Sequence, residues 1–180
     1  MKNKITSVFA IACIFFVSCS TTPKKTTEQA SEKIIQAVAT ENTKPVTDVL
    51  PAFKLRAASG SIINLENLKG KKVFINLWAT WCPPCKAEIP SIEKLYSKVD
   101  KTKVVFILLS LDDNFETAKT FAKANKMNLP VYYAAESLPA MFNTQGIPAT
   151  FIFNEKGELI KMNNGMDNYD TDEYVKLLKY

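Results

Sequence analysis

Two cysteines in the stretch NLWATWCPPCKAEIP, residues 76–90, have a spacing that could carry redox chemistry. Cys82 and Cys85 are separated by Pro83 and Pro84, and an apolar segment precedes them. A C-x-x-C pair of this kind can be half of a zinc site, a short structural disulfide or a reactive dithiol. The rest of the sequence discriminates between these three uses.

The absence of histidine narrows the chemistry that this chain of 180 residues can carry. It excludes His-based acid–base catalysis, Cys–His nucleophile pairs and metal sites that contain histidine. A four-ligand zinc site would need two more Cys or His ligands, and besides the C-x-x-C pair the sequence has only Cys13 and Cys19. Both lie at the start of the chain, where an export signal is expected. We therefore predict no metal site within one chain.

A reactive dithiol explains the C-x-x-C pair better than a structural disulfide does. A disulfide over so short a spacing constrains few residues of the unfolded chain, so it stabilises the fold little. Cys82 is expected where a buried strand turns into a helix, and the unpaired N–H groups of a helix start stabilise a thiolate. Pro83 and Pro84 suit the first helical turn and leave the Cys85 N–H able to donate toward the Cys82 sulfur. Cys85, one turn further in, would be the shielded, resolving thiol.

The segments around the dithiol alternate between patterns typical of strands and of helices. Strands are predicted in a hairpin over 53–65 that turns at Ser59–Gly60, in buried runs at 71–78 and 103–111, at 129–135, and in a hairpin over 149–162. Helices are predicted after the cysteines with a kink at Pro90, over 115–125 with an Asp113–Glu116 capping box, over 137–143, and at the end of the chain with Asp170 and Glu173 as caps. This order predicts an α/β protein whose mixed central sheet has helices on both faces.

The first twenty residues have the pattern of an export signal. Lys2 and Lys4 precede an apolar run over 5–17, which is shorter than the ~20 residues that a membrane-spanning helix needs. Ser18 and Cys19 resemble the lipobox of bacterial lipoproteins, in which the chain is cut before the cysteine and that cysteine carries lipid; a plain secretory signal is the alternative. We predict a signal peptide at 1–18, a lipidated Cys19 with a flexible tether over 19–46, and a folded domain over 47–180.

Two motifs resemble a known family. WATWCPPCKAEIP is similar to the active-site motif of thioredoxin-fold proteins, specifically the TlpA/ResA-like membrane-anchored thiol–disulfide oxidoreductases. GIPATFIFNEKGELI, residues 146–160, resembles the second landmark of that family, a cis-proline followed by a β-hairpin. The resemblance covers about 46–180. It implies a thioredoxin-like fold with an N-terminal β-hairpin, a central strand–helix insertion at about 115–143, and no cofactor.

The resemblance also implies roles for residues near the dithiol. Cys82 would attack the substrate, and Pro148 would be cis and packed against the cysteines. Ile147 would offer backbone hydrogen bonds to an extended substrate, while Trp81 and Pro83 would shape the surface that the substrate contacts. These are predicted substrate-binding residues.

Glu88 is the predicted proton relay. Plain thioredoxin has a buried aspartate six positions before its first cysteine, but the residue here is Asn76, which cannot accept a proton. The TlpA/ResA-like group instead has a glutamate three residues after the second cysteine, which corresponds to Glu88. Residues at i and i+3 share a helix face, so a desolvated Glu88 could take the proton of Cys85. A solvent-exposed helix glutamate is the alternative.

We therefore expect a monomeric, lipid-anchored oxidoreductase on the periplasmic side of a bacterial membrane. Its partners would be protein dithiols or disulfides and an upstream membrane electron donor. By analogy with the group, whose members act in cytochrome c maturation, we expect a reductase. The net charge of +5 comes with scattered lysines, so nucleic-acid binding is not expected.

Three other functions remain as alternatives. A peroxiredoxin would share the fold but needs a P-x-x-x-T-x-x-C motif, which this sequence lacks around its cysteines. A copper-delivery protein of the Sco type would need C-x-x-x-C spacing and a histidine. A non-catalytic module that binds partners without turning over the dithiol is the third.

Overall fold

The computed structural model describes residues 48–179, which belong to one compact unit. The predicted signal peptide, Cys19 and the tether lie outside these residues. Within 48–179 no helix is long and apolar enough to cross a membrane.

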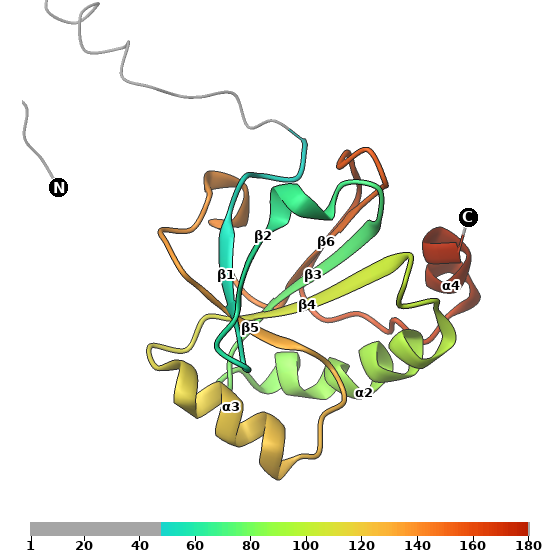
Figure 1. Cartoon of the computed structure of the whole chain (residues 1–180). Coiled ribbons are helices and arrows are strands. Elements are labelled where there is room, and N and C mark those ends of the chain that lie inside the picture. The colour runs from blue at the N-terminus through green and yellow to red at the C-terminus, as the bar shows by residue number, and fades with distance from the viewer. Residues whose placement is uncertain (1–47, 180) are drawn as a thin grey trace, which may run out of the picture. The chain divides into compact units, whose positions relative to one another are not determined.

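The described residues form one mixed sheet of seven strands (Figure 1). The strands are β1 Lys54–Ala57, β2 Ile62–Asn64, β3 Lys72–Trp78, β4 Val104–Ser110, β5 Val131–Ala134, β6 Ala149–Phe153 and β7 Leu159–Asn164, in the spatial order β2-β1-β5-β4-β3-β6-β7. The helices are α2 Pro83–Lys98, α3 Phe115–Ala124 and α4 Asp172–Lys179, with 3-10 helices η1 Leu65–Leu68 and η2 Ala140–Phe142. β3, β4 and β5 run parallel, and the pairs β3–β6, β6–β7, β1–β5 and β1–β2 are antiparallel.

Both faces of the central strands are buried. Along β3, Phe74 and Trp78 enter one apolar cluster and Ile75 enters the other, because successive side chains of a strand point to opposite faces. The first cluster contains the apolar side chains of α2, α3 and α4; the second is closed by Leu65 of η1 and Phe142 of η2. Figure 1 shows α2 and α3 along one side of the sheet. The predicted mixed sheet with helices on both faces is confirmed, although the second face is covered by 3-10 helices.

The sheet topology brings the two sequence motifs together. Helix α2 follows the carboxyl end of β3 after a short loop, so the cysteines lie at that end of the sheet. β6 is antiparallel to β3, and its first residue, Ala149, pairs with Leu77 near the same end. Pro148 therefore reaches the dithiol although more than sixty residues separate it from Cys82.

The predicted strands agree with the structure, but the predicted helix caps do not. Asn114, not Asp113, caps α3, because its side chain accepts the Glu116 N–H at 2.9 Å. Asp170 lies before α4, and its carboxylate forms ion pairs with lysines of α2 instead of capping. Helix α2 continues through Pro90.

Two connecting segments also differ in detail from the sequence prediction. The 3-10 helix η1 was not predicted. The predicted insertion at 115–143 forms α3, then β5, then η2, so its helix precedes its strand.

Candidate active site

The dithiol lies at the first turn of α2. Cys82 is the N-cap residue, with extended backbone, and Pro83 and Pro84 occupy the first helical positions. The Cys85 N–H donates to the Cys82 Sγ at 3.3 Å, as expected from the sequence. Cys82 and Cys85 are joined in a disulfide, so this is the oxidised form. A thiolate at Cys82 would keep the same N–H donor and the favourable end of the helix dipole.

The two cysteines differ in access to solvent. Cys85 is fully buried, whereas Cys82 is 4% exposed. Cys82 is therefore the more accessible of the two. This asymmetry fits an attacking Cys82 and a resolving Cys85.

The predicted substrate-binding residues lie around Cys82. The Ile147–Pro148 peptide bond is cis, and the Ile147 carbonyl oxygen is 3.7 Å from the Cys82 Sγ. Trp81 is 65% exposed although it is next to the disulfide, and Pro83 is exposed as well. An exposed tryptophan beside a reactive sulfur offers a flat apolar contact to a partner.

Glu88 is buried, with 2% of its surface exposed. The Asn76 Nδ2 donates to its Oε1 at 2.8 Å, and the Asp167 backbone N–H donates to its Oε2 at 3.1 Å. Burial raises the pKa of Glu88 to about 7; the two hydrogen bonds lower it, and the nearby Asp167 charge raises it. The structure thus excludes the alternative of a solvent-exposed glutamate, and it gives Glu88 a proton affinity suited to exchange near neutral pH.

A chain of buried polar groups continues from Glu88 into the sheet. Asn76 pairs with Thr150 across β3 and β6, and its Nδ2 also donates to the Thr150 Oγ1 at 2.9 Å. The Tyr169 hydroxyl donates to the same oxygen at 2.6 Å. Thr150 and Tyr169 were not predicted for the site, because nothing in the local sequence marks residues this far from the cysteines as their neighbours.

Asp112 braces the loop that carries the dithiol. Its carboxylate accepts hydrogen bonds from the Thr80 backbone N–H at 3.2 Å and from the Thr80 hydroxyl at 2.6 Å. The Ser110 hydroxyl donates to it at 2.9 Å. Asp112 was not predicted for the site; β4 ends beside the loop after β3, and Asp112 binds across that gap.

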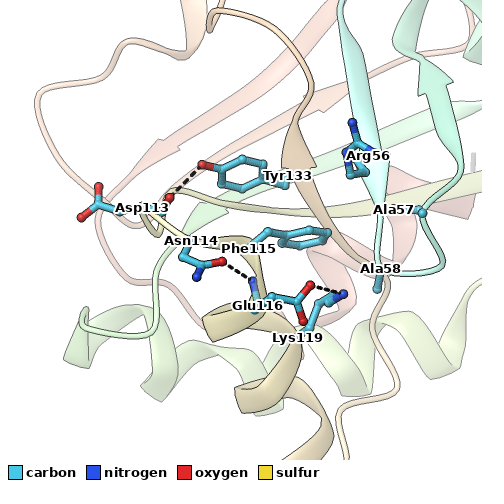
Figure 2. Close-up of a pocket in the computed structure, with 10 residues that line it drawn as sticks. Arg56, Ala57, Ala58, Asp113, Asn114, Phe115, Glu116, Lys119 and Tyr133 are labelled. Carbon is cyan, nitrogen blue, oxygen red and sulfur yellow. Dashed lines mark hydrogen bonds and ion pairs between the residues drawn. The ribbon is translucent and has the colours of Figure 1, made fainter.

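A surface pocket lies apart from the dithiol. It has a volume of about 480 Å³ and is formed by the turn after β1, the start of α3 and β5. Figure 2 shows Phe115 and Tyr133 side by side in it, with Arg56 near one rim and the Glu116–Lys119 ion pair near another. None of the predicted site residues lines this pocket.

Among residues 48–179, no group of three or more Cys, Asp or Glu side chains is arranged to hold a metal ion.

Comparison with known proteins supplies the family. A family model described as Redoxin matches residues 45–178. This chain belongs to the redoxin family. It is 31% identical over 129 residues to the thiol-disulfide oxidoreductase ResA of Halalkalibacterium halodurans, a match that covers 71% of this chain and 73% of that protein.

Other relatives agree with this assignment. The chain is 37% identical over 109 residues to the thioredoxin-like protein YneN of Bacillus subtilis, covering 59% of this chain and 64% of that protein. The crystal structure of StoA from Bacillus subtilis is similar with a TM-score of 0.59 and 29% identity, covering 70% of this chain and 99% of that one. A thiol:disulfide interchange protein from Chlorobium tepidum gives a TM-score of 0.63 at 27% identity, covering 72% and 94%. The predicted thioredoxin-like fold, the ResA-like resemblance and the class of thiol–disulfide oxidoreductase are confirmed.

Proposed function

We propose that this protein reduces disulfide bonds in other proteins on the extracytoplasmic side of a bacterial membrane. The observation that carries the proposal is the position of Cys82, which caps α2, accepts the Cys85 N–H and lies against the cis-Pro148 loop. This arrangement places one reachable sulfur next to one buried sulfur, as a dithiol exchange reaction requires.

The reaction has two thiolate attacks. The Cys82 thiolate attacks one sulfur of the substrate disulfide, forms a mixed disulfide with it and releases the other substrate sulfur as a thiolate. The Cys85 thiolate then attacks the Cys82 sulfur and releases the first substrate sulfur. Two electrons pass to the substrate, and the Cys82–Cys85 disulfide remains, which is the form in this structure. An upstream membrane dithiol donor returns the two electrons.

Glu88 supports the second attack. Cys85 is buried, so its thiol cannot pass a proton directly to bulk water. Glu88 lies three residues further along α2 on the same helix face, and burial brings its pKa to about 7. The ionised Glu88 takes the proton of Cys85, which makes Cys85 the nucleophile that resolves the mixed disulfide.

The substrate lies in an extended conformation against the cis-Pro148 loop. Ile147 offers its backbone there, and Trp81 and Pro83 form the exposed rim around Cys82. Because these contacts are mostly to backbone and a flat aromatic face, the site suits protein disulfides of varied sequence.

The predicted location follows from the residues that precede the folded domain. Lipid on Cys19 would hold the protein at the membrane, since each buried CH₂ contributes about 0.8 kcal/mol. The oxidising side of the membrane is also where protein disulfides arise and need reduction, as in cytochrome c maturation. Replacing Cys19 with Ala is expected to abolish labelling by a fatty-acid probe and to release the protein from the membrane fraction. Retention of both label and location would contradict the anchor.

Trapping in cells tests the reaction itself. Cys85→Ser keeps Cys82 but removes the resolving sulfur, so mixed disulfides with substrates should accumulate. Non-reducing electrophoresis would separate them, and mass spectrometry would identify the substrates. Cys82→Ser is the matched control and should trap none. Equal recovery of partners by both variants would contradict attack by Cys82 and would favour a non-catalytic binding module.

The direction of electron flow needs a separate measurement. A reductase requires a reduction potential of the dithiol nearer the thioredoxin value of about −270 mV than the DsbA value of about −120 mV. Equilibration of the full chain with defined glutathione mixtures would give the potential. A reduction potential near the DsbA value would contradict a reductase and would indicate an enzyme that oxidises protein dithiols.

A further inference from the structure

Glu88 is held by hydrogen-bond donors on both of its oxygens. The Asn76 side-chain amide binds Oε1 at 2.8 Å, and the backbone N–H of Asp167 binds Oε2 at 3.1 Å. Two donors and no acceptor suit an ionised carboxylate, which accepts hydrogen bonds only. Asp167 donates through its backbone N–H, so of the two donors only the one from Asn76 belongs to a side chain.

The orientation of the Asn76 amide is fixed from its far side. Its second N–H donates to the Thr150 hydroxyl at 2.9 Å, and that hydroxyl also accepts from Tyr169 at 2.6 Å. The Asn76 Oδ1 is buried and has no hydrogen-bond partner among the described residues. A buried unpaired carbonyl is unfavourable, so the amide is a poor choice for packing alone beside apolar Ile75 and Leu77.

We propose that Asn76 is a positioning residue for proton transfer, whose amide keeps Glu88 in the form and place to accept the proton of Cys85. The inference rests on the proposed relay by Glu88 and deepens it. In the step itself the S–H bond of Cys85 breaks, an O–H bond forms on Glu88, and the electron pair stays on sulfur. Asn76 gains and loses no proton.

The groups that bind Glu88, and those that hold its partners in place, come from four parts of the fold. Asn76 lies on β3 and Thr150 on β6, while Tyr174 lies on α4. The loop before α4 brings Asp167 and Tyr169. The Asp167 carboxylate is itself held by the Tyr174 hydroxyl and by the side chain of Asn163 at 2.9 Å, and burial keeps the pKa of both tyrosines above the ordinary value. Of the two groups that donate to Glu88, Asn76 is therefore the one whose donor is a side chain, and that side chain does not titrate.

Two substitutions of Asn76 in the full chain separate positioning from packing. Asn76→Ala removes the donor, and the pKa of Glu88 should rise by about one unit or more because a charge-assisted hydrogen bond is lost. Asn76→Asp keeps the shape but puts a second acid beside Glu88, so the pair should titrate in two steps with the upper step raised further. The isosteric variant keeps the test usable if the alanine variant folds poorly.

The measurement is the infrared band of the protonated carboxylic acid, assigned by its loss in Glu88→Gln and followed against pH in the oxidised protein. Asn164→Ala, which replaces an exposed asparagine at the end of β7, is the matched control and should leave the titration unchanged. When the reduced protein reacts with a disulfide substrate, the pH at which resolution of the mixed disulfide reaches half its maximal rate should rise with the pKa of Glu88.

Separate outcomes test the inference and the proposed function. If the Asn76 variants leave the Glu88 titration where it is while Glu88→Gln still alters the resolution rate, the inference about Asn76 is wrong and the relay stands. If they move the Glu88 titration but the pH profile of resolution stays fixed, Asn76 sets the proton affinity as inferred and the relay by Glu88 is wrong.

Discussion

At the scale of single residues, the carboxyl group of Glu88 is buried in the site and changes its protonation state near neutral pH. Glu88 is 2% exposed, and its pKa is raised from 4.5 to about 7 mainly by burial. The folded state therefore binds this proton more tightly than the unfolded state does. The resulting contribution to stability is fully present below about pH 4.5 and is lost as the pH rises through about 7.

This sign gives a stability prediction for Glu88→Gln. In the oxidised protein, where neither cysteine titrates, the wild-type free energy of unfolding should fall by about 3 kcal/mol from this group as the pH rises across that window. Glu88→Gln should lack this fall, as measured by urea unfolding at a series of pH values. Glu66→Gln changes an exposed glutamate and should keep the wild-type slope. Parallel curves for wild type and Glu88→Gln would contradict a raised pKa.

Trp81 leads to a prediction about partners. Since its side chain is 65% exposed, Trp81→Ala should change the free energy of unfolding by less than about 0.5 kcal/mol. It should raise KM for a protein disulfide by about three- to tenfold, equivalent to roughly 1 kcal/mol of lost contact. Reduction of a small disulfide should be unaffected, and Trp81→Phe should recover most of the loss. An equal effect on small and protein disulfides would contradict a contact role.

At the scale of elements, the predictions from sequence succeeded where a pattern is local. The buried runs that became β3 and β4 are continuous in sequence, and the start of α2 is marked by Cys82 and two prolines. The same local reasoning failed at the caps. Asp113 and Asn114 are adjacent and both suit an N-cap, so one-residue shifts of the helix start decide between them.

The partners of the site residues were not predictable for a different reason. Asp167 is 79 positions from Glu88, and Thr150 is 74 positions from Asn76, so their contacts depend on the packing of β6 and the last loop onto α2. No periodicity or motif in the sequence indicates that such residues are paired. Asp112 is a further example, since it binds Thr80 across two parallel strands.

The Asp112 brace gives a prediction at this scale. Asp112→Ala leaves the Thr80 N–H and hydroxyl without their buried acceptor, so the free energy of unfolding should fall by about 3 kcal/mol. Hydrogen exchange should increase at the loop amides of residues 79–82, and kcat/KM for a protein disulfide should fall. Asp113→Ala, at the adjacent exposed aspartate, should do neither. Unchanged exchange at these amides in Asp112→Ala would show that the loop is held by other contacts.

At the scale of the whole molecule, the residues of the site meet at one end of the sheet, around the Cys82–Cys85 disulfide. β3 supplies Asn76 and leads into the cysteines, the cis-proline immediately precedes β6, and α2 carries Glu88 three residues after Cys85. The fold thus separates two tasks. The rim around Cys82 meets the partner, and the buried groups around Glu88 handle the proton.

The account depends most directly on Cys82 being a thiolate at neutral pH. The decisive measurement is the rate of Cys82 alkylation by iodoacetamide against pH in the reduced full chain, with Cys85→Ser used to isolate the one sulfur. Because the start of α2 and the residue 85 N–H both favour negative charge, the pKa of Cys82 should be at or below about 7. A Cys82 pKa near the ordinary thiol value of about 8.5 would contradict the account.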